Sequence, residues 1–291
     1  MELTALQDGA MLEVIANALR EDVGMGDITT ECTIPTDLPG VGIFSAKANG
    51  VLSGLDIAAA VLALVDERLA VEAHLRDGMP LLRGMKIATV RGPIASMLTA
   101  ERTALNFMQR MSGIATLTAS FVKLTEGFAV KIMDTRKTAP GLRAFDKQAV
   151  RDGRGVNHRF GLDDMVLIKD NHIAASGGIA EAVRLVRARM PRDRRLQVEV
   201  EATTMQQVLE ALSVDGIDII MLDNFRPDDM ARAVKLIASR KPALEVEASG
   251  NVSEETVRDI AESGVHRISI GALTHSVKAL DISFNIAMDA E

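Results

Sequence analysis

The chain has 291 residues, a formal net charge of −7 at pH 7, and neither tryptophan nor tyrosine. The shortage of large aromatic residues argues against stacking platforms for single-stranded nucleic acid, and the negative charge repels polyanions. Both observations exclude nucleic acid as the expected partner.

Cysteine content and the N-terminal residues bear on the compartment. The single cysteine, Cys32, cannot form an internal disulfide, which fits a reducing environment. The first residues include Glu2, Asp8 and Glu13 and lack the basic flank of a secretory signal. No uncharged apolar run approaches the length that spans a membrane. We therefore expect a cytoplasmic protein with no membrane partner.

The first part of the chain, to about residue 110, mixes helical and extended patterns. In chain order we expect a helix with apolar positions Leu12, Ile15 and Leu19, an extended run at 42–46, an apolar helix at 57–65, a turn at Asp77-Gly78, a strand at 86–90 and a long helix after Pro93. This mixture is typical of a small α+β domain.

From residue 129 onward, apolar β-branched runs alternate with amphipathic segments. The expected strands are 130–133, 165–168, 196–200, 217–222, 244–248 and 267–270, and the expected helices are 179–190, 205–212, 227–239 and 253–263. Pro227 suits a first helical turn, and Ser253 is a candidate N-cap. The alternation predicts parallel strands joined by crossover helices. Six strands are too few for a closed eight-stranded barrel, so an open doubly wound sheet remains the alternative architecture.

Polar residues follow each expected strand. They occupy positions 134–137, 169–171, 201, 223–224, 249–251 and 271. The carboxyl ends of parallel strands meet at one edge of a sheet, where ligands bind. Polar residues that merely begin loops would account for one or two of these positions, whereas complementary cations and carboxylates at all six predict one pocket.

The segment 131–160 holds eight basic and three acidic residues, a local charge of +5 in an acidic protein. Proline and glycine interrupt it and its apolar periodicity is weak, so we expect a long functional loop. A concentrated positive patch indicates a small polyanion as the ligand. The candidates to hold two carboxylates on a small ring are Arg136, Lys137, His158, Arg159 and Lys169.

Acidic residues lie on the neighbouring strands. Glu199 and Glu201 are two residues apart on one strand and project from the same face, and Asp223 ends the next strand. Buried acids require cations, a metal or ligand hydroxyls. Carboxylates beside a phosphorylated substrate indicate Mg²⁺ that is shared with the substrate.

The last two strand ends predict a phosphate site. The run 249–251 leads into one expected helix, and 271–274 leads into another. Glycine lets a phosphate approach backbone N–H groups, and a helix N-terminus favours its charge.

Motifs along nearly the whole chain resemble those of the quinolinate phosphoribosyltransferase family. They are Glu21-Asp22-x-Gly24-x-Gly26-Asp27-x-Thr29-Thr30, Glu101 to Asn106 with Ser112 to Thr116, Asp134 to Thr138, Gly153-x-Gly155-Val156-Asn157-His158-Arg159, Ile168 to His172, Val198 to Glu201, Leu222-Asp223-Asn224, Glu247 to Gly250 and Gly271 to His275. One departure is Asn251, where a second glycine is common in the family.

The resemblance implies an architecture and an assembly. It implies an N-terminal open-faced α+β sandwich domain, 1–112, and an incomplete α/β barrel of about seven strands, 113–276. The C-terminal tail, about 277–291, is a candidate to pack back on the first domain. A homodimer or higher oligomer is expected, in which Arg102 reaches into the partner's pocket.

The resemblance also assigns roles to individual residues. Quinolinate is expected at Arg102, Thr135, Arg136, Lys137, His158, Arg159 and Lys169. The ribose and Mg²⁺ are expected at Glu201 and Asp223, and the 5-phosphate at Ser249, Gly250, Asn251, Ser269, Ile270 and Gly271. Lys137, Lys169, Glu201 and Asp223 are the expected catalytic residues.

The implied reaction joins quinolinate to phosphoribosyl pyrophosphate, releases CO₂ and pyrophosphate, and forms nicotinate mononucleotide for NAD biosynthesis. Three rival interpretations remain. One is a nicotinate phosphoribosyltransferase or molybdenum-transport-associated relative of the same fold. A second is a barrel aldolase with Lys137 or Lys169 as a Schiff-base amine. The third is a non-catalytic anion-binding protein, which gives no reason for Glu201 and Asp223.

Overall fold

The computed structural model describes residues 8–191 and 194–288. Within these residues the chain divides into two compact units. The first unit comprises 8–119, 138–154 and 273–288, and the second comprises 120–137 and 155–272. Glu2 and positions 289–291 of the predicted C-terminal tail lie outside the described residues.

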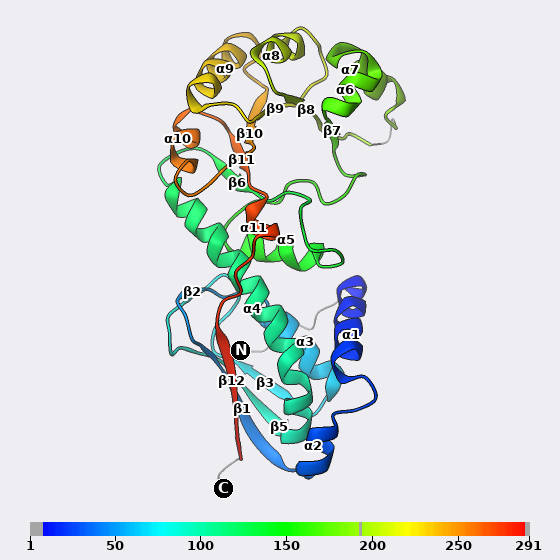
Figure 1. Ribbon diagram of the computed structural model, residues 1–291, viewed down its shortest axis with the longest axis vertical. Coiled ribbons are helices and arrows are strands. Elements are labelled where there is room, and N and C mark those ends of the chain that lie inside the picture. Colours follow the sequence, from blue (N-terminus) through cyan, green and yellow to red (C-terminus); the bar gives the residue numbers. More distant parts are fainter. Residues whose placement is uncertain (1–7, 192–193, 289–291) are drawn as a thin grey trace. The chain divides into compact units, whose positions relative to one another are not determined.

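The first unit contains a four-stranded antiparallel sheet in the order β12-β1-β5-β3 (Figure 1). Its strands are β1 (Pro39–Ala46), β3 (Ala70–Ala73), β5 (Lys86–Pro93) and β12 (Ile282–Met288), and β2 (Gly50–Val51) pairs separately with β4 (Pro80–Leu81). The two strands predicted at 42–46 and 86–90 are confirmed within β1 and β5. Phe44 of β1 stacks on Phe284 of β12, with ring centroids 4.2 Å apart. This contact fastens the C-terminal strand to the edge of the sheet.

The helices of the first unit include those predicted around Ile15, at 57–65 and after Pro93. They are α1 (Gly9–Val23), α2 (Ile28–Thr33), α3 (Leu55–Val65), α4 (Ile94–Leu124), which continues into the second unit, α5 (Arg143–Asp152) and α11 (Ala272–His275). Asp8 caps α1 by accepting from the backbone N–H groups of Ala10 and Met11, and Gly24 ends the helix at φ 58°. The buried positions of α1 are Met11, Ile15 and Leu19, so Met11 replaces the predicted Leu12.

Helix α5 corrects the prediction of a long loop over 131–160. Phe145, Ala149 and Val150 form its buried face. Asp146 is also buried and receives two hydrogen bonds of 2.9 Å from the guanidinium of Arg110. The basic patch is therefore divided, because 138–154 cluster with the first unit whereas Arg136, Lys137 and Arg159 lie in the second.

The second unit contains a six-stranded parallel sheet in the order β6-β11-β10-β9-β8-β7. Its strands are β6 (Lys131–Met133), β7 (Val166–Ile168), β8 (Val198–Ala202), β9 (Ile219–Asp223), β10 (Glu245–Ser249) and β11 (Arg267–Ser269), and all six were predicted. Val156 adds a one-residue parallel bridge to Met133 on the free edge of β6. The α/β fold with a separate antiparallel sheet agrees with the predicted class, and the parallel sheet has six strands and one isolated bridge where about seven strands were predicted.

Crossover helices follow the strands of the second unit. They are α6 (Asp170–Ser176), α7 (Ile179–Arg189), α8 (Met205–Leu212), α9 (Pro227–Arg240) and α10 (Val257–Glu262). Successive helices from α6 to α10 pack beside one another, and Figure 1 shows α7, α8 and α9 along the same side of the sheet. Pro227 begins α9 as predicted. The prediction of Ser253 as an N-cap is wrong, because α10 begins at Val257 and residues 254–256 form a turn.

The proposed domain boundary at residue 112 falls inside α4 and stays a prediction. Strand β12, in the predicted C-terminal tail, pairs antiparallel with β1 from Gly40 to Ala46. The first unit is therefore built from three separate stretches of the chain.

Candidate active site

The two faces of the parallel sheet carry different side chains. Residues paired in register project from the same side of a parallel sheet. The pairing Val200↔Ile220 and Ala248↔Leu222 puts four buried aliphatic residues on one side, which we call the aliphatic face. Residues of the opposite side, which we call the polar face, include Glu199, Glu201, Asp223, Glu245, Glu247, Ser249, Arg267 and Ser269. Of the predicted strand-end residues, Glu201, Asp223 and Ser249 thus share one face.

Lys169 and Glu201 form an ion pair on this polar face. Lys169 follows β7, Glu201 lies near the end of β8, and the Nζ–Oε2 distance is 2.5 Å. The Glu201 side chain is 9% exposed and the Lys169 side chain 44% exposed. The ammonium compensates a buried carboxylate while one side of the lysine stays open to solvent.

The end of β9 is joined to the glycine turn after β10. Asp223 and Ser249 are direct partners in register. The Asn224 side chain donates to Asp223 at 2.7 Å and accepts from the side chain of Asn251 at 3.0 Å. The carboxylate at the end of β9 therefore has a fixed orientation relative to the turn.

Backbone conformation explains the residues of this turn. Gly250 has φ 91°, and a Cβ there would lie 2.2 Å from Oδ1 of Asn224. Asn251 has φ 50°, in the left-handed region that asparagine tolerates better than most residues. The asparagine at position 251 is thus compatible with a turn in which the family commonly has a second glycine.

Arg136 and Arg159 lie near one another although both are cationic. Burial and then the charge of Arg136 lower the pKa of Arg159 below its usual range. The Nη1 of Arg159 donates to the carbonyl of Met165 at 3.3 Å. Among the described residues, Nε of Arg136 is buried without a hydrogen-bond partner. Two partly desolvated guanidinium groups of like charge are an arrangement that an anion would stabilise.

His158 is 8% exposed and lies beside two fully buried acids. Its Nε2 is 3.1 Å from Glu199 and 3.5 Å from Glu247, while its Nδ1 accepts from the backbone N–H of Arg159 at 2.7 Å. Burial lowers the pKa of His158, whereas the two carboxylates raise it. The Arg159 N–H acts against this rise because it requires a lone pair on Nδ1. The observed geometry matches the ring with its proton on Nε2.

The other predicted residues have separate positions. Thr135 accepts from the backbone N–H of Lys137 at 3.1 Å, and Lys137 is exposed. Ser269 ends β11 on the polar face, and the N–H of Ile270 donates to the carbonyl of Met133 at 2.9 Å. Gly271 follows directly, and α11 begins at the next residue. Arg102 is exposed on α4 in the first unit, and its contact with a partner subunit stays a prediction.

The acids of the polar face include two groups able to bind a cation. Glu201 and Asp223 offer carboxylate oxygens from adjacent strands, which fits a hard divalent ion shared with phosphates. Nearer the start of the strands, His158, Glu199 and Glu247 bring one ligand atom each within 4.8 Å of one another. Burial raises the pKa of Glu199, which disfavours the charged form that a metal requires.

Comparison with protein families matches the chain to two domain models that meet near residue 113, inside α4. The quinolinate phosphoribosyl transferase C-terminal domain matches residues 114–285, and the N-terminal domain of the same family matches residues 27–112. The chain belongs to the quinolinate phosphoribosyltransferase family.

Relatives in this family cover most of the chain. The probable nicotinate-nucleotide pyrophosphorylase [carboxylating] of Bacillus subtilis is 42% identical and covers 93% of this chain and 91% of its own length. The chloroplastic enzyme of that name from Arabidopsis thaliana is 47% identical over 94% of this chain and 82% of its own length. The solved nicotinate-nucleotide pyrophosphorylase of Francisella tularensis is 35% identical, with a TM-score of 0.90 and 99% coverage of both chains.

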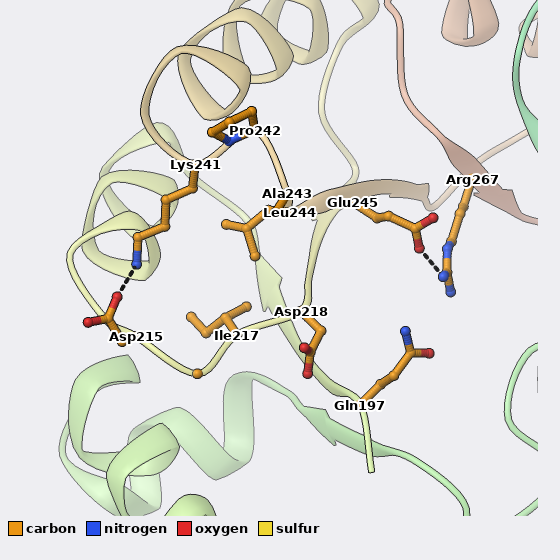
Figure 2. A pocket seen from close by; sticks show the side chains of 11 residues that line it. Gln197, Asp215, Ile217, Asp218, Lys241, Pro242, Ala243, Leu244, Glu245 and Arg267 are labelled. Atoms are coloured by element: carbon orange, nitrogen blue, oxygen red, sulfur yellow. Dashed lines mark hydrogen bonds and ion pairs between the residues drawn. The ribbon is translucent and has the colours of Figure 1, made fainter. Parts of the chain in front are cut away.

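An open depression lies at the opposite ends of the strands. Figure 2 shows Gln197, Ile217, Asp218, Leu244 and Arg267 around it, all at or just before the starts of β8 to β11. Arg267 pairs there with Glu245, and Lys241 pairs with Asp215 at 2.9 Å (Figure 2). In both ion pairs the charged residues of the depression already neutralise one another. The depression contains none of the residues that the family resemblance assigns to quinolinate or phosphoribose.

Sequence reasoning assigned no role to two side chains next to the predicted site. Glu247 contacts His158, and Asn224 orients Asp223. Glu245 and Glu247 have the same two-residue spacing as Glu199 and Glu201, and this spacing could have indicated Glu247. Among the described residues no helix combines the length and the apolar character needed to cross a membrane.

Proposed function

We propose that this chain transfers the phosphoribosyl group of phosphoribosyl pyrophosphate to quinolinate, with decarboxylation, to give nicotinate mononucleotide, pyrophosphate and CO₂. Family membership supports this reaction, as do relatives named quinolinate phosphoribosyltransferase [decarboxylating]. The observation that carries the proposal is the pair of partly desolvated guanidiniums, Arg136 and Arg159, in the unit that also holds Glu201 and Asp223. The first pair suits a dicarboxylate and the second pair suits a sugar with a metal.

The cations would hold quinolinate. Arginine forks bind carboxylates through two parallel hydrogen bonds, and lysine adds a compact charge. We assign quinolinate to Arg136, Arg159, Lys137 and Lys169, with Thr135 supporting the backbone of the loop through its bond from Lys137. Lys169 already pairs with Glu201, so substrate would rearrange this contact.

The acids and the glycine turns would hold the second substrate. Glu201 and Asp223 would bind the ribose hydroxyls and Mg²⁺, which when bound would neutralise charge on the pyrophosphate group. The runs 249–251 and 269–271 would bind the 5-phosphate through backbone N–H groups. Asn224 would keep the Asp223 carboxylate oriented toward the ribose, because it donates to Oδ2.

The reaction needs no protein nucleophile. The C1–O bond to pyrophosphate breaks, the leaving group takes the bonding electrons, and the oxocarbenium-like carbon accepts the lone pair of the quinolinate ring nitrogen. The C2–carboxylate bond of the resulting pyridinium then breaks, and its electrons pass into the ring while CO₂ departs. A proton from solvent restores C2–H. Orientation of the two substrates contributes up to about 7–11 kcal/mol to such reactions.

Dimer formation and location belong to the same proposal. We place Arg102 in the pocket of a partner subunit, supported by its exposure on α4 and by the family motif that contains it. A charge reversal, Arg102→Glu, is expected to inactivate the enzyme without unfolding it. Mixing it with Arg136→Ala should restore part of the activity through hybrid sites once subunit exchange is verified. The lone exposed cysteine agrees with a cytoplasmic enzyme.

The Schiff-base alternative is disfavoured by one contact. A Schiff-base lysine needs an amine that is free to attack a carbonyl carbon, whereas the Nζ of Lys169 is engaged by Oε2 of Glu201 at 2.5 Å. Borohydride reduction with a carbonyl substrate should therefore leave Lys169 unmodified.

A coupled assay tests the proposed function. Purified protein, Mg²⁺, phosphoribosyl pyrophosphate and quinolinate carrying a labelled 2-carboxylate are expected to yield nicotinate mononucleotide and labelled CO₂ in equal amounts. Replacing quinolinate by nicotinate should abolish turnover. Equal or faster turnover of nicotinate would assign the chain to the rival activity of the same fold.

A further inference from the structure

His158 lacks a ring nitrogen directed toward a substrate. Nδ1 accepts the backbone N–H of Arg159 at 2.7 Å, and Nε2 faces Glu199 at 3.1 Å and Glu247 at 3.5 Å. A nitrogen that accepts from an N–H group carries no proton, so the ring proton lies on Nε2, the nitrogen within ion-pair distance of the two carboxylates. Both polar atoms of the imidazole are thus engaged by the protein.

The two carboxylates depend on this ring. Glu199 of β8 and Glu247 of β10 are fully buried on the polar face. Among the described residues, the carboxylate oxygens of both acids have no hydrogen-bond partner, and the nearby compensating groups are Nε2 of His158, within 3.1 and 3.5 Å, and the positive charge of Arg267, which acts on Glu199. A buried carboxylate without a compensating group is strongly destabilising, so the approach of Nε2 to 3.1 and 3.5 Å stabilises both acids and favours this position of the ring.

The residue held by the other side of the ring is Arg159. Its backbone N–H is held by Nδ1, and Nη1 is held by the Met165 carbonyl at 3.3 Å. Arg136 repels it, as the lowered pKa of Arg159 indicates. Two guanidiniums of like charge separate unless other contacts hold them in place. The His158 ring provides one such contact, because its Nδ1 accepts from the backbone N–H of Arg159.

We propose that Glu199 and Glu247 are positioning residues that hold the His158 ring, and that His158 orients Arg159 instead of contacting quinolinate itself. The role assigned to Arg159 rests on the proposed function. The state of the imidazole does not, so the two can fail separately.

The first experiment examines the ring without turnover. The chain has five histidines, so ¹⁵N-histidine labelling with a His158→Gln variant identifies the His158 signals. We expect a ring with a proton on Nε2 and an unprotonated Nδ1 at pH 7.5. Addition of quinolinate should change the chemical shift of either nitrogen only slightly. A proton on Nδ1, or a large quinolinate-induced shift at either nitrogen, overturns the inference even if the enzyme is active.

The second experiment separates positioning from a structural role. Glu247→Leu removes the acceptor, and Glu247→Gln keeps an amide oxygen that can accept from Nε2–H. We expect Glu247→Leu to raise KM for quinolinate about tenfold, with KM for phosphoribosyl pyrophosphate within about twofold, because a displaced Arg159 affects one substrate. Glu247→Gln should recover most of the loss.

The matched control is Glu245→Gln, two residues earlier on the same strand and face, where the partner is Arg267. It should leave both KM values within about twofold. An equal loss in both substrates for Glu247→Leu, or no recovery in Glu247→Gln, contradicts a positioning role. Where Glu247→Leu fails to fold, the nuclear magnetic resonance result and the glutamine variant still decide.

Metal analysis closes the remaining alternative. His158, Glu199 and Glu247 have ligand atoms within 4.8 Å of one another, an arrangement that a divalent ion could also use. Wild-type protein and Glu247→Gln are each dialysed against Zn²⁺ or Mn²⁺ and then against buffer. We expect both proteins to retain the same amount of metal. One equivalent of metal retained by the wild type and lost by the variant would make the cluster a metal site and overturn the proposal.

Discussion

The two faces of the parallel sheet are formed by the same strands but carry different side chains. On the aliphatic face, residues such as Val200, Leu222 and Ala248 are fully buried. On the polar face, one residue further along or back, the same strands bury Glu199, Glu201 and Glu247. The aliphatic face therefore contributes stability, whereas the polar face accepts the desolvation of charges in exchange for a preorganised site.

The largest predicted effect is the loss of turnover on the cationic side of the polar face. Arg159→Ala should lower kcat/KM for quinolinate at least about 100-fold, because a guanidinium that binds a carboxylate is removed. The free energy of unfolding should change by no more than about 1 kcal/mol. Steady-state kinetics and urea unfolding measure the two effects.

Arg184→Ala is the matched control, since Arg184 pairs with Glu181, three residues away on an exposed face of α7. It should change neither quantity appreciably. Full activity of Arg159→Ala would remove this arginine from the site.

The reverse pattern is expected on the aliphatic face. Leu222 is fully buried there, and Leu222→Ala should lower the free energy of unfolding by about 2–5 kcal/mol through lost burial and a cavity. Activity per folded molecule should fall less than about threefold below the unfolding transition. Urea unfolding with active-site titration checks this, and a stable but inactive variant would show that the two faces are not independent.

The glycine turn at the end of β10 tests whether backbone conformation at position 250 contributes to binding on the polar face. Gly250→Ala should raise KM for phosphoribosyl pyrophosphate about tenfold, because φ 91° and the contact with Asn224 require a shift of the loop. Asn251→Gly should stay within about threefold, since glycine also adopts φ 50°. Equal effects of the two changes would argue against a backbone origin.

A buried acid in the first unit gives the smallest effect. Burial raises the pKa of Asp77 to about 6, from 3.8, although its oxygens accept from the N–H groups of Gly54 and Leu55. The folded state then binds the proton more tightly than the unfolded state. The contribution of Asp77 to stability is therefore greatest below about pH 4 and is lost as pH rises toward 6, amounting to about 1–3 kcal/mol.

Thermal unfolding from pH 4 to pH 7 tests this sign. The wild type should lose stability relative to Asp77→Asn as the pH rises through this window, because asparagine does not titrate. A difference of opposite slope would mean that the two N–H groups outweigh burial.

Much of this arrangement could be predicted from the sequence, and the exceptions have physical reasons. Continuous β-branched runs located all six parallel strands, and the period of two placed Glu199 and Glu201 on one face. Helix α5 was missed because its flanking glycines and charges resemble a loop, while its stabilising contact, Arg110 to Asp146, joins residues 36 apart. Helix α10 begins after a turn that local capping rules did not distinguish from a helix start.

The candidate site divides in the same way. Strand-end positions of Lys169, Glu201 and Asp223 followed from periodicity, because a parallel sheet aligns its carboxyl ends. The partners of His158 did not follow, since hydrogen-bond directions at an imidazole depend on the position of a loop relative to β8 and β10. Glu247 belonged only to a family motif in the sequence, and its contact with His158 became visible in the structure.

A crystal structure of the protein with quinolinate and a non-hydrolysable analogue of phosphoribosyl pyrophosphate tests the central claim most directly. We predict the two carboxylates of quinolinate at the guanidinium groups of Arg136 and Arg159, and the ribose at Glu201 and Asp223, at the carboxyl ends of the strands. Quinolinate bound instead in the depression beside Lys241 and Arg267, at the opposite ends, would contradict the assignment of the site to the polar strand ends.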